Sequence, residues 1–462
     1  MSYLLRLLEK EKFSTVLSYL EGWKRGEVEL EKEEIATAVK CKRPEVSFKA
    51  VEGLFERFSF EEVKEIFKEL FNITPLSPPV KFSFPAINEK EGVLIKALAF
   101  LSDKTFSPKE ELSQVKEVTQ KEFGFFYNRE FSGESFQAPL AYALLYGELP
   151  KRVILSGKLL PKGNFKAENA KEKEEVATKE GKFLIAEGNI HEIKEFFSKE
   201  EKDIPLLIAT GKREENIPNF EIFCKNVGFK PLKGLLDEEK LIVELPTFLP
   251  HDRDWRELFL PIREKVLKLK EFLPDLSLHV ALKAPITFSL GAGAVIGTGK
   301  VPVAVYHFEN GSYHRVIDLR KDSRRIKRRK RKLSFIEVEE EVRGSDTAVI
   351  ALQVASHETR SKGEELSQKF NADFFYVNAP ELKGSLPLDL DWAEVVAEIY
   401  EAFNRIYAKG HKKFHLVMSV PNPIAFALGM AVGNYWDVTV WSYFKPLKDY
   451  RPVYNLGEVE NV

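Results

Sequence analysis

One serine and one lysine in the sequence could together act as a nucleophile and its base. Ser135 lies in a Gly-Glu-Ser turn just before a predicted helix, and Lys173 lies in a second predicted helix, AENAKEKEEVATKEG (residues 167–181). A serine hydroxyl is a poor nucleophile at neutral pH unless a base stands beside it. A lysine can be that base if apolar surroundings lower its pKa. The pair would then attack a carbonyl carbon and form an acyl-enzyme.

The periodicity of the second helix decides which lysine qualifies. Residues 170, 176 and 177 are alanine or valine and lie three or four positions from Lys173, so Lys173 projects from the apolar face. Lys171 falls on the charged face. The residue types alone leave a structural interpretation open, because a serine near a helix start often caps it and a lysine beside alanine often extends its amine to solvent.

An internal duplication predicts a second kind of site. The stretch LHVALKAPITFSLGAGAVIG (residues 278–297) aligns without a gap with FHLVMSVPNPIAFALGMAVG (residues 414–433), at a spacing of 136. Upstream, DRDW pairs with DLDW, and each is predicted to open an amphipathic helix. Internal repetition constrains the architecture of a chain. We therefore expect two similar α/β half-domains side by side.

Each half reads as strand, helix, strand, helix, strand. The leading strands are KLIVELPTF and TAVIALQVAS, and the closing strands are VPVAVYHF and DVTVWSYF. This order is typical of an open, largely parallel sheet, which binds ligands at the carboxyl ends of its strands. The proline turn lies there, and the helix after it points free N–H groups outward, which predicts a phosphate site. Alternatively, the glycines and alanines only let this helix pack closely on the sheet.

Composition limits the classes of function. The chain has 462 residues, enough for roughly three domains. Lys+Arg number 70 and Asp+Glu 71, so the net charge of −1 suggests neither a DNA-duplex partner nor attraction to a membrane. Cys41 and Cys224 lack disulfide or metal-ligand spacing, which favours a reducing cytoplasm. We expect a cytoplasmic protein with no metal, no cofactor and no membrane segment.

Breaks in pattern divide this α/β multidomain chain into three. Residues 1–78 are helical by period, with a capping box at Ser59 and Glu62, and the run PLSPP ends them. We expect a small helical bundle there, with docking of a partner as the alternative role. Residues 79–235 form a second, α/β unit. Residues 236–462 hold the duplication, with halves at about 236–332 and 333–462.

Residues 130–195 resemble the proteolytic domain of the Lon family. Lon enzymes carry a nucleophilic serine in a Gly-Pro-Ser-Ala-Gly turn, then a Thr-Gly-Glu turn after a strand, then Lys-Glu-Lys opening a helix. The corresponding stretches here are Gly133-Glu134-Ser135-Phe136-Gln137, Ser156-Gly157-Lys158 and Lys171-Glu172-Lys173. The resemblance implies that Ser135 is the nucleophile, Lys173 the general base and Ser156 the hydroxyl that steadies the lysine. Ser132 is the alternative nucleophile.

Residues 236–462 resemble the SAVED sensor domain, which consists of two fused CARF-like halves. The paired proline turns with their small helices and the tyrosine-containing closing strands carry this resemblance. A Lon-like domain joined to a SAVED domain is similar to the CRISPR-associated Lon-SAVED proteases. That family implies a serine protease effector of type III CRISPR antiphage signalling. It would bind a cyclic oligoadenylate, foremost cyclic tetra-adenylate, associate with itself, and cleave an anti-sigma-like partner protein.

Carried over from the SAVED resemblance, the ligand would lie across both proline turns and the ends of the first strands. His357 could stack on a base or be only a polar loop residue, whereas His279 and His415, inside strands of both repeats, are expected to be structural. The ligand-binding residues implied are Thr247, Lys283, Pro285, Thr287, Ser356, His357, Ser419, Pro421 and Asn422.

Two questions stay open. The run RKDSRRIKRRKRK (residues 320–332) holds ten Lys or Arg in thirteen residues, which is typical of an exposed, mobile and solvated segment. It could also contact nucleic acid, an acidic partner or the anionic ligand. The competing function is a non-catalytic cyclic-nucleotide sensor or scaffold, in which the Lon-like unit is inactive and the only output is assembly.

Overall fold

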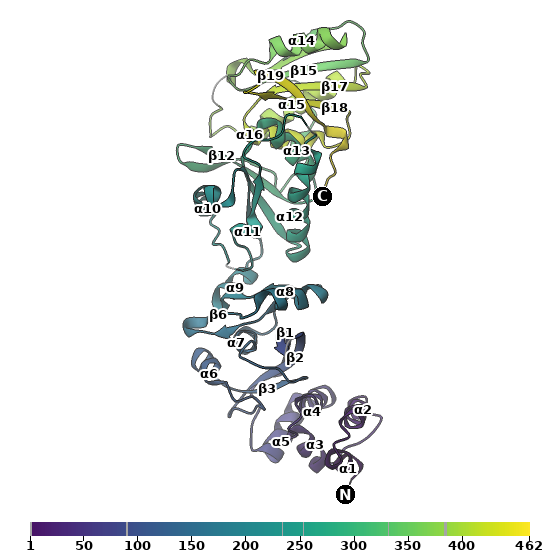
Figure 1. Ribbon diagram of the computed structural model, residues 1–462, viewed down its shortest axis with the longest axis vertical. Helices are drawn as coiled ribbons and strands as arrows, with labels where there is room; N and C mark the ends of the chain where they lie inside the picture. The colour runs from purple at the N-terminus through teal and green to yellow at the C-terminus, as the bar shows by residue number, and fades with distance from the viewer. Residues whose placement is uncertain (1, 89–90, 233, 253, 331, 383–385) are drawn as a thin grey trace. The chain divides into compact units, whose positions relative to one another are not determined.

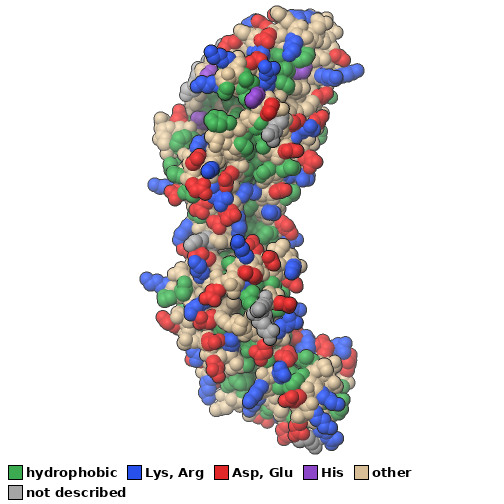
Figure 2. Space-filling model, in the orientation of Figure 1, with side chains coloured by type: hydrophobic (Ala, Val, Ile, Leu, Met, Phe, Trp, Pro, Cys, Tyr) green, Lys and Arg blue, Asp and Glu red, His purple; other side chains and the backbone are tan. Residues whose placement is uncertain are grey.

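A computed structural model describes residues 2–88, 91–232, 234–252, 254–330, 332–382 and 386–462 (Figure 1). The chain forms two compact units. The N-terminal unit comprises Met1–Glu200 with Leu232–Leu235, and the C-terminal unit comprises Glu201–Pro231 with Leu236–Val462. Lys and Arg side chains are interspersed with Asp and Glu on the face in Figure 2, in keeping with the near-zero net charge.

Five helices open the N-terminal unit, as the periodicity predicted. The capping box is present, because the Ser59 hydroxyl accepts from the Glu62 amide and the Glu62 carboxylate accepts from the Ser59 amide. The helices do not form a separate bundle, since Phe100 and Phe126 of the following sheet belong to their core. Their bounds are α1 (Tyr3–Glu9), α2 (Phe13–Lys24), α3 (Lys32–Val39), α4 (Pro44–Arg57) and α5 (Phe60–Phe71).

The rest of the N-terminal unit is α/β. An antiparallel sheet of order β1-β2-β3 is followed by a parallel pair, β4-β7, and a small antiparallel sheet, β5-β6-β8. The helices α7 and α8 follow the predicted serine turn and lysine motif. The strands are β1 (Val80–Asn88), β2 (Glu91–Ser102), β3 (Glu122–Tyr127), β4 (Val153–Leu155), β5 (Lys158–Leu159), β6 (Asn164–Lys166), β7 (Phe183–Ile185) and β8 (Glu187–Asn189). The helices are α6 (Ser113–Thr119), α7 (Gln137–Tyr146), η1 (Pro161–Gly163), α8 (Ala170–Lys179) and α9 (Ile190–Ser198).

The first half of the C-terminal unit is a five-stranded sheet of order β10-β9-β11-β12-β13, parallel except for the last pair. Strand β9 was expected in the middle unit, residues 79–235. It lies instead between β10 and β11 of this sheet, and its apolar run, buried on both faces, requires these neighbours. The elements are β9 (Lys202–Thr210), α10 (Arg213–Val227), α11 (Glu238–Leu241), β10 (Ile242–Leu245), η2 (Arg256–Phe259), α12 (Leu260–Phe272), β11 (Leu276–Lys283), α13 (Ile286–Ile296), β12 (Val303–Glu309) and β13 (Ser312–Asp318).

The second half is a six-stranded sheet of order β14-β16-β15-β17-β18-β19, with antiparallel strands at both edges. No helix in the described part of the chain has both the length and the apolar character needed to cross a bilayer. The elements are η3 (Arg325–Lys327), β14 (Glu337–Glu341), β15 (Thr347–Gln353), α14 (Arg360–Phe370), β16 (Asp373–Asn378), η4 (Pro380–Leu382), α15 (Trp392–Tyr407), β17 (Lys413–Ser419), α16 (Asn422–Val432), β18 (Val438–Phe444), β19 (Asp449–Asn455) and η5 (Leu456–Glu458).

The duplication is confirmed, but one pairing of strands is corrected. Strand β9 pairs with β11 as β15 pairs with β17, so TAVIALQVAS corresponds to β9. The stretch KLIVELPTF contains β10, the neighbour of β9, and therefore corresponds to β16. Thr247 and the Ser356-His357 loop, which were expected at matching places, follow strands that are not equivalent.

The basic run of residues 320–332 is packed on the fold at several points, whereas its charge predicted an exposed and solvated segment. Ile326 is fully buried, Arg325 pairs with Asp391, and Lys330 pairs with Glu394 at the start of α15. These acidic partners anchor the segment to the helix. Residue 331 of the run lies outside the described residues.

The two small-residue helices, α13 and α16, lie against each other (Figure 1), and their glycines are at the contact. A Cβ atom on Gly293 would lie 1.9 Å from the carbonyl oxygen of Phe426, and one on Gly429 would lie 1.8 Å from that of Leu290. Each glycine therefore faces the backbone of the partner helix. The contact relates the two halves by an approximate twofold.

We expect Gly293→Ala to lower the free energy of unfolding of the C-terminal unit by at least about 1–3 kcal/mol, because the backbones at the crossing must separate. Gly22→Ala is the matched control: a Cβ on this helical glycine would meet its nearest atom at an ordinary 3.5 Å. That variant should be neutral or more stable by about 0.5–1 kcal/mol. Calorimetric unfolding measures both. Equal stability of Gly293→Ala and the unaltered protein would show that the crossing is looser.

Candidate functional site

The predicted serine and lysine are in contact. Nζ of Lys173 and Oγ of Ser135 are hydrogen-bonded at 2.7 Å. When the amine is neutral, the same contact can carry the serine proton to Nζ. The two residues come from different elements, since Ser135 precedes α7 and Lys173 lies in the first turns of α8. The geometry is that of a nucleophile and its general base.

The serine turn is fixed through its backbone. Gly133 has a φ of 74°, a left-handed conformation that glycine adopts without strain. The amide of Gly157 donates to the carbonyl of Ser135 at 2.9 Å, and the carbonyl of Gly157 accepts from Ala138 in α7. The turn at residues 156–158 is thus hydrogen-bonded to the backbone on both sides of Phe136, next to Ser135.

The two bulky neighbours of Ser135 have structural roles of their own. Phe136 is fully buried and stacks on Phe125 of β3, with ring centroids 5.3 Å apart. Glu134 forms an ion pair with Lys158 at 2.6 Å. One residue anchors the turn in the core and the other ties it to β5, so the serine stays between two fixed points.

Burial sets the electrostatics of the lysine. Lys173 is only 2% exposed, although no carboxylate forms an ion pair with it among the described residues. Burial lowers the pKa of Lys173, while the carboxylates of Glu168 and Glu172 oppose the shift. A lowered pKa increases the fraction of neutral amine, which is the form that accepts a proton.

The apolar packing behind α8 holds the lysine in place. Val176, one turn beyond Lys173, packs so closely on Gly92 of β2 that a Cβ there would lie 2.5 Å from its side chain. Ala177 is fully buried. The apolar face predicted from the helical period therefore packs on the sheet, and the lysine side chain projects from that buried face.

The two other serines have different partners. The hydroxyl of Ser156 donates to the carbonyl of Pro85 at 2.8 Å, so its hydrogen-bond partner is β1 and not the lysine. Ser156 therefore holds the turn at residues 156–158 against β1, whereas the hydrogen bond of Lys173 goes to Ser135. Ser132, the alternative nucleophile, is exposed and donates to the carbonyl of Ile87 at 3.1 Å. Of the two candidate nucleophiles, Ser135 is the one in contact with Lys173.

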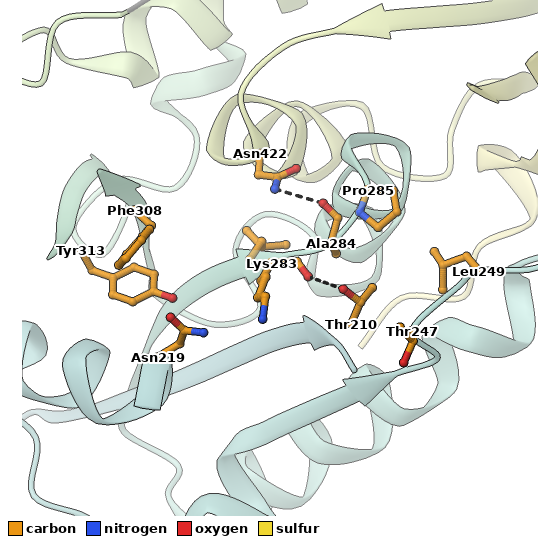
Figure 3. A pocket seen from close by; sticks show the side chains of 11 residues that line it. Thr210, Asn219, Thr247, Leu249, Lys283, Ala284, Pro285, Phe308, Tyr313 and Asn422 are labelled. Atoms are coloured by element: carbon orange, nitrogen blue, oxygen red, sulfur yellow. Dashed lines mark hydrogen bonds between the residues drawn. The ribbon is translucent and has the colours of Figure 1, made fainter. Parts of the chain in front are cut away.

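A pocket of about 570 Å³ opens at the carboxyl edge of the first-half sheet (Figure 3). In Figure 3, Phe308 and Tyr313 flank Lys283 on one side, and Thr247 and Leu249 flank it on the other. Four residues expected at the ligand line this pocket, which is where an open α/β sheet binds ligands. The lining residues are Thr210, Asn219, Thr247, Leu249, Leu282, Lys283, Ala284, Pro285, Phe308, Tyr313 and Asn422.

Lys283 is held by a neutral partner. Its amine donates to Oδ1 of Asn216 at 3.0 Å, and the amide of the same fully buried Asn216 donates to the carbonyls of Thr210 and Lys212. Because asparagine is neutral, the positive charge of Lys283 is positioned without being cancelled. Asn422, the first residue of α16, donates to the carbonyl of Ala284 and so connects the two proline turns.

The other expected ligand residues lie outside this pocket. Thr287 is buried and donates to the hydroxyl of Ser442 at 2.9 Å. Ser356 and His357 are exposed in the loop after β15. Pro421 caps α16, and the hydroxyl of Ser419 is buried with no hydrogen-bond partner among the described residues.

Several lining residues escaped the sequence interpretation. Thr210 was missed because β9 was placed in the other unit. Phe308 and Tyr313 face each other across the hairpin of β12 and β13. The turn residues Asn310 and Gly311 both have positive φ and are a recognisable hairpin signal. That dipeptide could have located the aromatic pair.

The two repeated histidines are structural, as expected. Nδ1 of His279 is hydrogen-bonded to the hydroxyl of Tyr306, and Nδ1 of His415 accepts from the indole of Trp441. Both aromatic partners lie at equivalent places on the neighbouring strand. No three His, Cys, Asp or Glu side chains gather to form a metal site in the described ranges.

Comparison with known proteins identifies part of the chain. Residues 262–456 match the SAVED family, the SMODS-associated and fused to various effectors sensor domain. No curated protein sequence matches the chain.

Two solved structures show distant similarity. The Acinetobacter baumannii Cap4 SAVED/CARF-domain containing receptor with the cyclic trinucleotide 2'3'3'-cAAA has 15% identity and a TM-score of 0.37, covering 55% of this chain and 51% of that one. The Moraxella osloensis Cap4 SAVED/CARF-domain containing receptor has 13% identity and a TM-score of 0.39, covering 62% of this chain and 58% of that one. This chain spans little more than half the length of these receptors.

The family match lies within the C-terminal unit. It begins in α12 and ends at η5, and it includes both crossing helices and the proline turns. The expectation drawn from the paired turns is confirmed for this part of the chain: residues 262–456 are a SAVED domain.

Proposed function

We propose that the chain is a sensor protease, in which a cyclic oligonucleotide binds the SAVED domain and a Ser-Lys pair in the N-terminal unit cleaves a protein. The observation that carries the catalytic part is the 2.7 Å contact between Ser135 and a Lys173 that is almost completely buried. A lysine with only a structural role usually extends its amine to solvent. Burying the amine against a hydroxyl costs stability and suits a general base.

The chemistry follows from the pair. Neutral Lys173 removes the proton of Ser135 as Oγ attacks the scissile carbonyl carbon. The tetrahedral intermediate collapses to an acyl-enzyme, and the Lys173 ammonium returns the proton to the leaving amine. Water, deprotonated by the same amine, then hydrolyses the ester. The backbone N–H groups of Ser135 and Phe136 donate to no acceptor among the described residues, which leaves them available to the oxyanion.

The sensor part rests on the SAVED domain and its pocket. The pocket combines a lysine, several neutral polar groups and two aromatic rings at the carboxyl edge of a sheet. These groups suit the phosphates and bases of a cyclic oligoadenylate. A ligand shifts an equilibrium only through its different affinity for the two states. We infer that binding favours a self-associated state that presents an anti-sigma-like partner to the protease, as part of antiphage signalling.

Replacing the nucleophile separates the two activities. Ser135→Ala should reduce cleavage of a protein substrate, measured by gel and mass spectrometry with cyclic tetra-adenylate present, by at least about a thousandfold. Binding of the cyclic nucleotide should be unchanged. Ser132→Ala is the matched control and should keep its activity. If Ser135→Ala cleaves as fast as the unaltered protein, the nucleophile is another residue. If the unaltered protein cleaves nothing, a non-catalytic scaffold explains the chain better.

Lys173 predicts the pH profile. Because burial lowers its pKa, kcat/KM should be low in acid and rise as Lys173 loses its proton, with a midpoint below the 10.5 of a free lysine. Lys173→Arg should be inactive at every pH, because arginine stays protonated. A rate that stays flat through this range, or an active arginine variant, would contradict the role of Lys173 as base.

The pocket lysine can be tested by binding alone. Lys283→Ala should weaken binding of cyclic tetra-adenylate by roughly 10- to 100-fold, the effect of one charge-assisted hydrogen bond. Lys268→Ala, which removes an exposed lysine on α12, should bind as the unaltered protein does. Isothermal calorimetry measures both. Equal affinities for the two variants would place the ligand outside the pocket.

A further inference from the structure

The hairpins that close the two halves of the SAVED domain carry the same aromatic pair. Phe308 faces Tyr313 across the hairpin of β12 and β13, and Tyr443 faces Tyr450 across the hairpin of β18 and β19. The ring centroids lie 4.9 Å apart in the first pair and 5.3 Å in the second, with interplanar angles of 55° and 58°.

The backbone shows that these positions are equivalent. Each hairpin has an irregularity in its register, between Val305 and Tyr306 in the first half and between Val440 and Trp441 in the second. The first ring of each pair follows the irregularity at the same distance: Phe308 comes two residues after Tyr306, and Tyr443 comes two residues after Trp441. The match is therefore a property of the fold and not only of the sequence.

The first pair belongs to the pocket. Phe308 and Tyr313 line it together with Lys283, and Figure 3 shows the Tyr313 hydroxyl directed toward the space beside Asn219. Since β12 runs parallel to β11, the end of β12 that carries Phe308 lies at the carboxyl edge. The pair is placed beside the only cation in the described lining of this pocket.

The second half carries Ser419 at the place equivalent to Lys283. Ser419 ends β17 as Lys283 ends β11, and it pairs with Gln353 as Lys283 pairs with Ala209. Its hydroxyl is buried, with no hydrogen-bond partner among the described residues. A buried hydroxyl without a partner is costly in a folded protein, and a bound polar group would satisfy it.

Cross-strand aromatic pairs also stabilise hairpins without any ligand. Here, however, the outer ring of each pair stays open to solvent: Phe308 is 44% exposed and Tyr443 is 51% exposed. The open faces of these rings leave room for a base to stack. Both half-exposed rings lie near the carboxyl ends of strands that run toward the proline turns.

We infer that each half of the SAVED domain stacks one base of the cyclic oligonucleotide on its aromatic pair. Phe308 with Tyr313 is the platform of the first half, and Tyr443 with Tyr450 is the platform of the second. This inference rests on the proposed sensor function and adds a base-reading element to it. Purines present a larger face than pyrimidines, so adenine rings bind more tightly than uracil rings of the same size.

The test uses the full chain and four variants, with calorimetric titration of cyclic tri-adenylate, cyclic tetra-adenylate and cyclic tetra-uridylate. Phe308→Leu and Tyr443→Leu should each weaken binding of the preferred adenylate ring by roughly 5- to 150-fold, the effect of losing one stacked base. Tyr443→Phe keeps the ring and should restore most of the binding that Tyr443→Leu loses. Tyr435→Leu is the control, because this tyrosine is 76% exposed and lies outside both hairpins.

The outcomes separate the two proposals. If the unaltered protein binds none of the three rings, the sensor function fails and the stacking inference fails with it. If it binds adenylate but both leucine variants bind within twofold of it, sensing stands and stacking is overturned. If Phe308→Leu weakens binding and Tyr443→Leu does not, the equivalence of the two halves is overturned. Unchanged circular dichroism and melting of the leucine variants confirm that they fold.

Discussion

The close crossing of α13 and α16 is the constraint on which the SAVED domain depends. Two helices can touch backbone to backbone only where neither carries a side chain, and Gly293 and Gly429 provide that gap. The crossing fixes how the halves meet and brings both proline turns to one place, where Asn422 connects them. The proline turns then place the N-termini of both helices and Lys283 at the carboxyl edges of the sheets. A shift at the glycines would therefore change the pocket around Lys283.

The N-terminal unit also holds a residue whose burial lowers stability, Lys173. Lys173 is buried where its charged form is unfavourable, and the packing of Val176 on Gly92 keeps it there. The serine is held by backbone contacts to Gly157 and by Phe136 in the core. Ser135 and Lys173 are thus each fixed by elements outside the pair. This division is common where geometry must be kept within fractions of an ångström.

The sequence predicted what local periodicity and repetition can encode. The helical period placed Lys173 on a buried face, and the aligned glycines predicted two similar halves. It could not assign β9, because an apolar strand buried on both faces carries no sign of which sheet it joins. That error displaced Thr210 from the site and paired Thr247 with the wrong loop. It also missed Asn216, whose hydrogen bonds join segments that only the fold brings together.

The lining of the pocket has a consequence for how binding responds to ionic strength. Among the described residues that form it, Lys283 alone carries a formal charge, and its partner Asn216 is neutral. Salt weakens the binding of a polyanion to a protein in proportion to the number of Lys and Arg side chains that displace its counterions. Binding of a phosphate ring that is held mainly by amides, hydroxyls and aromatic faces would release few counterions. Recognition in this pocket would then stay nearly constant across the salt range in which DNA-binding proteins lose most of their affinity.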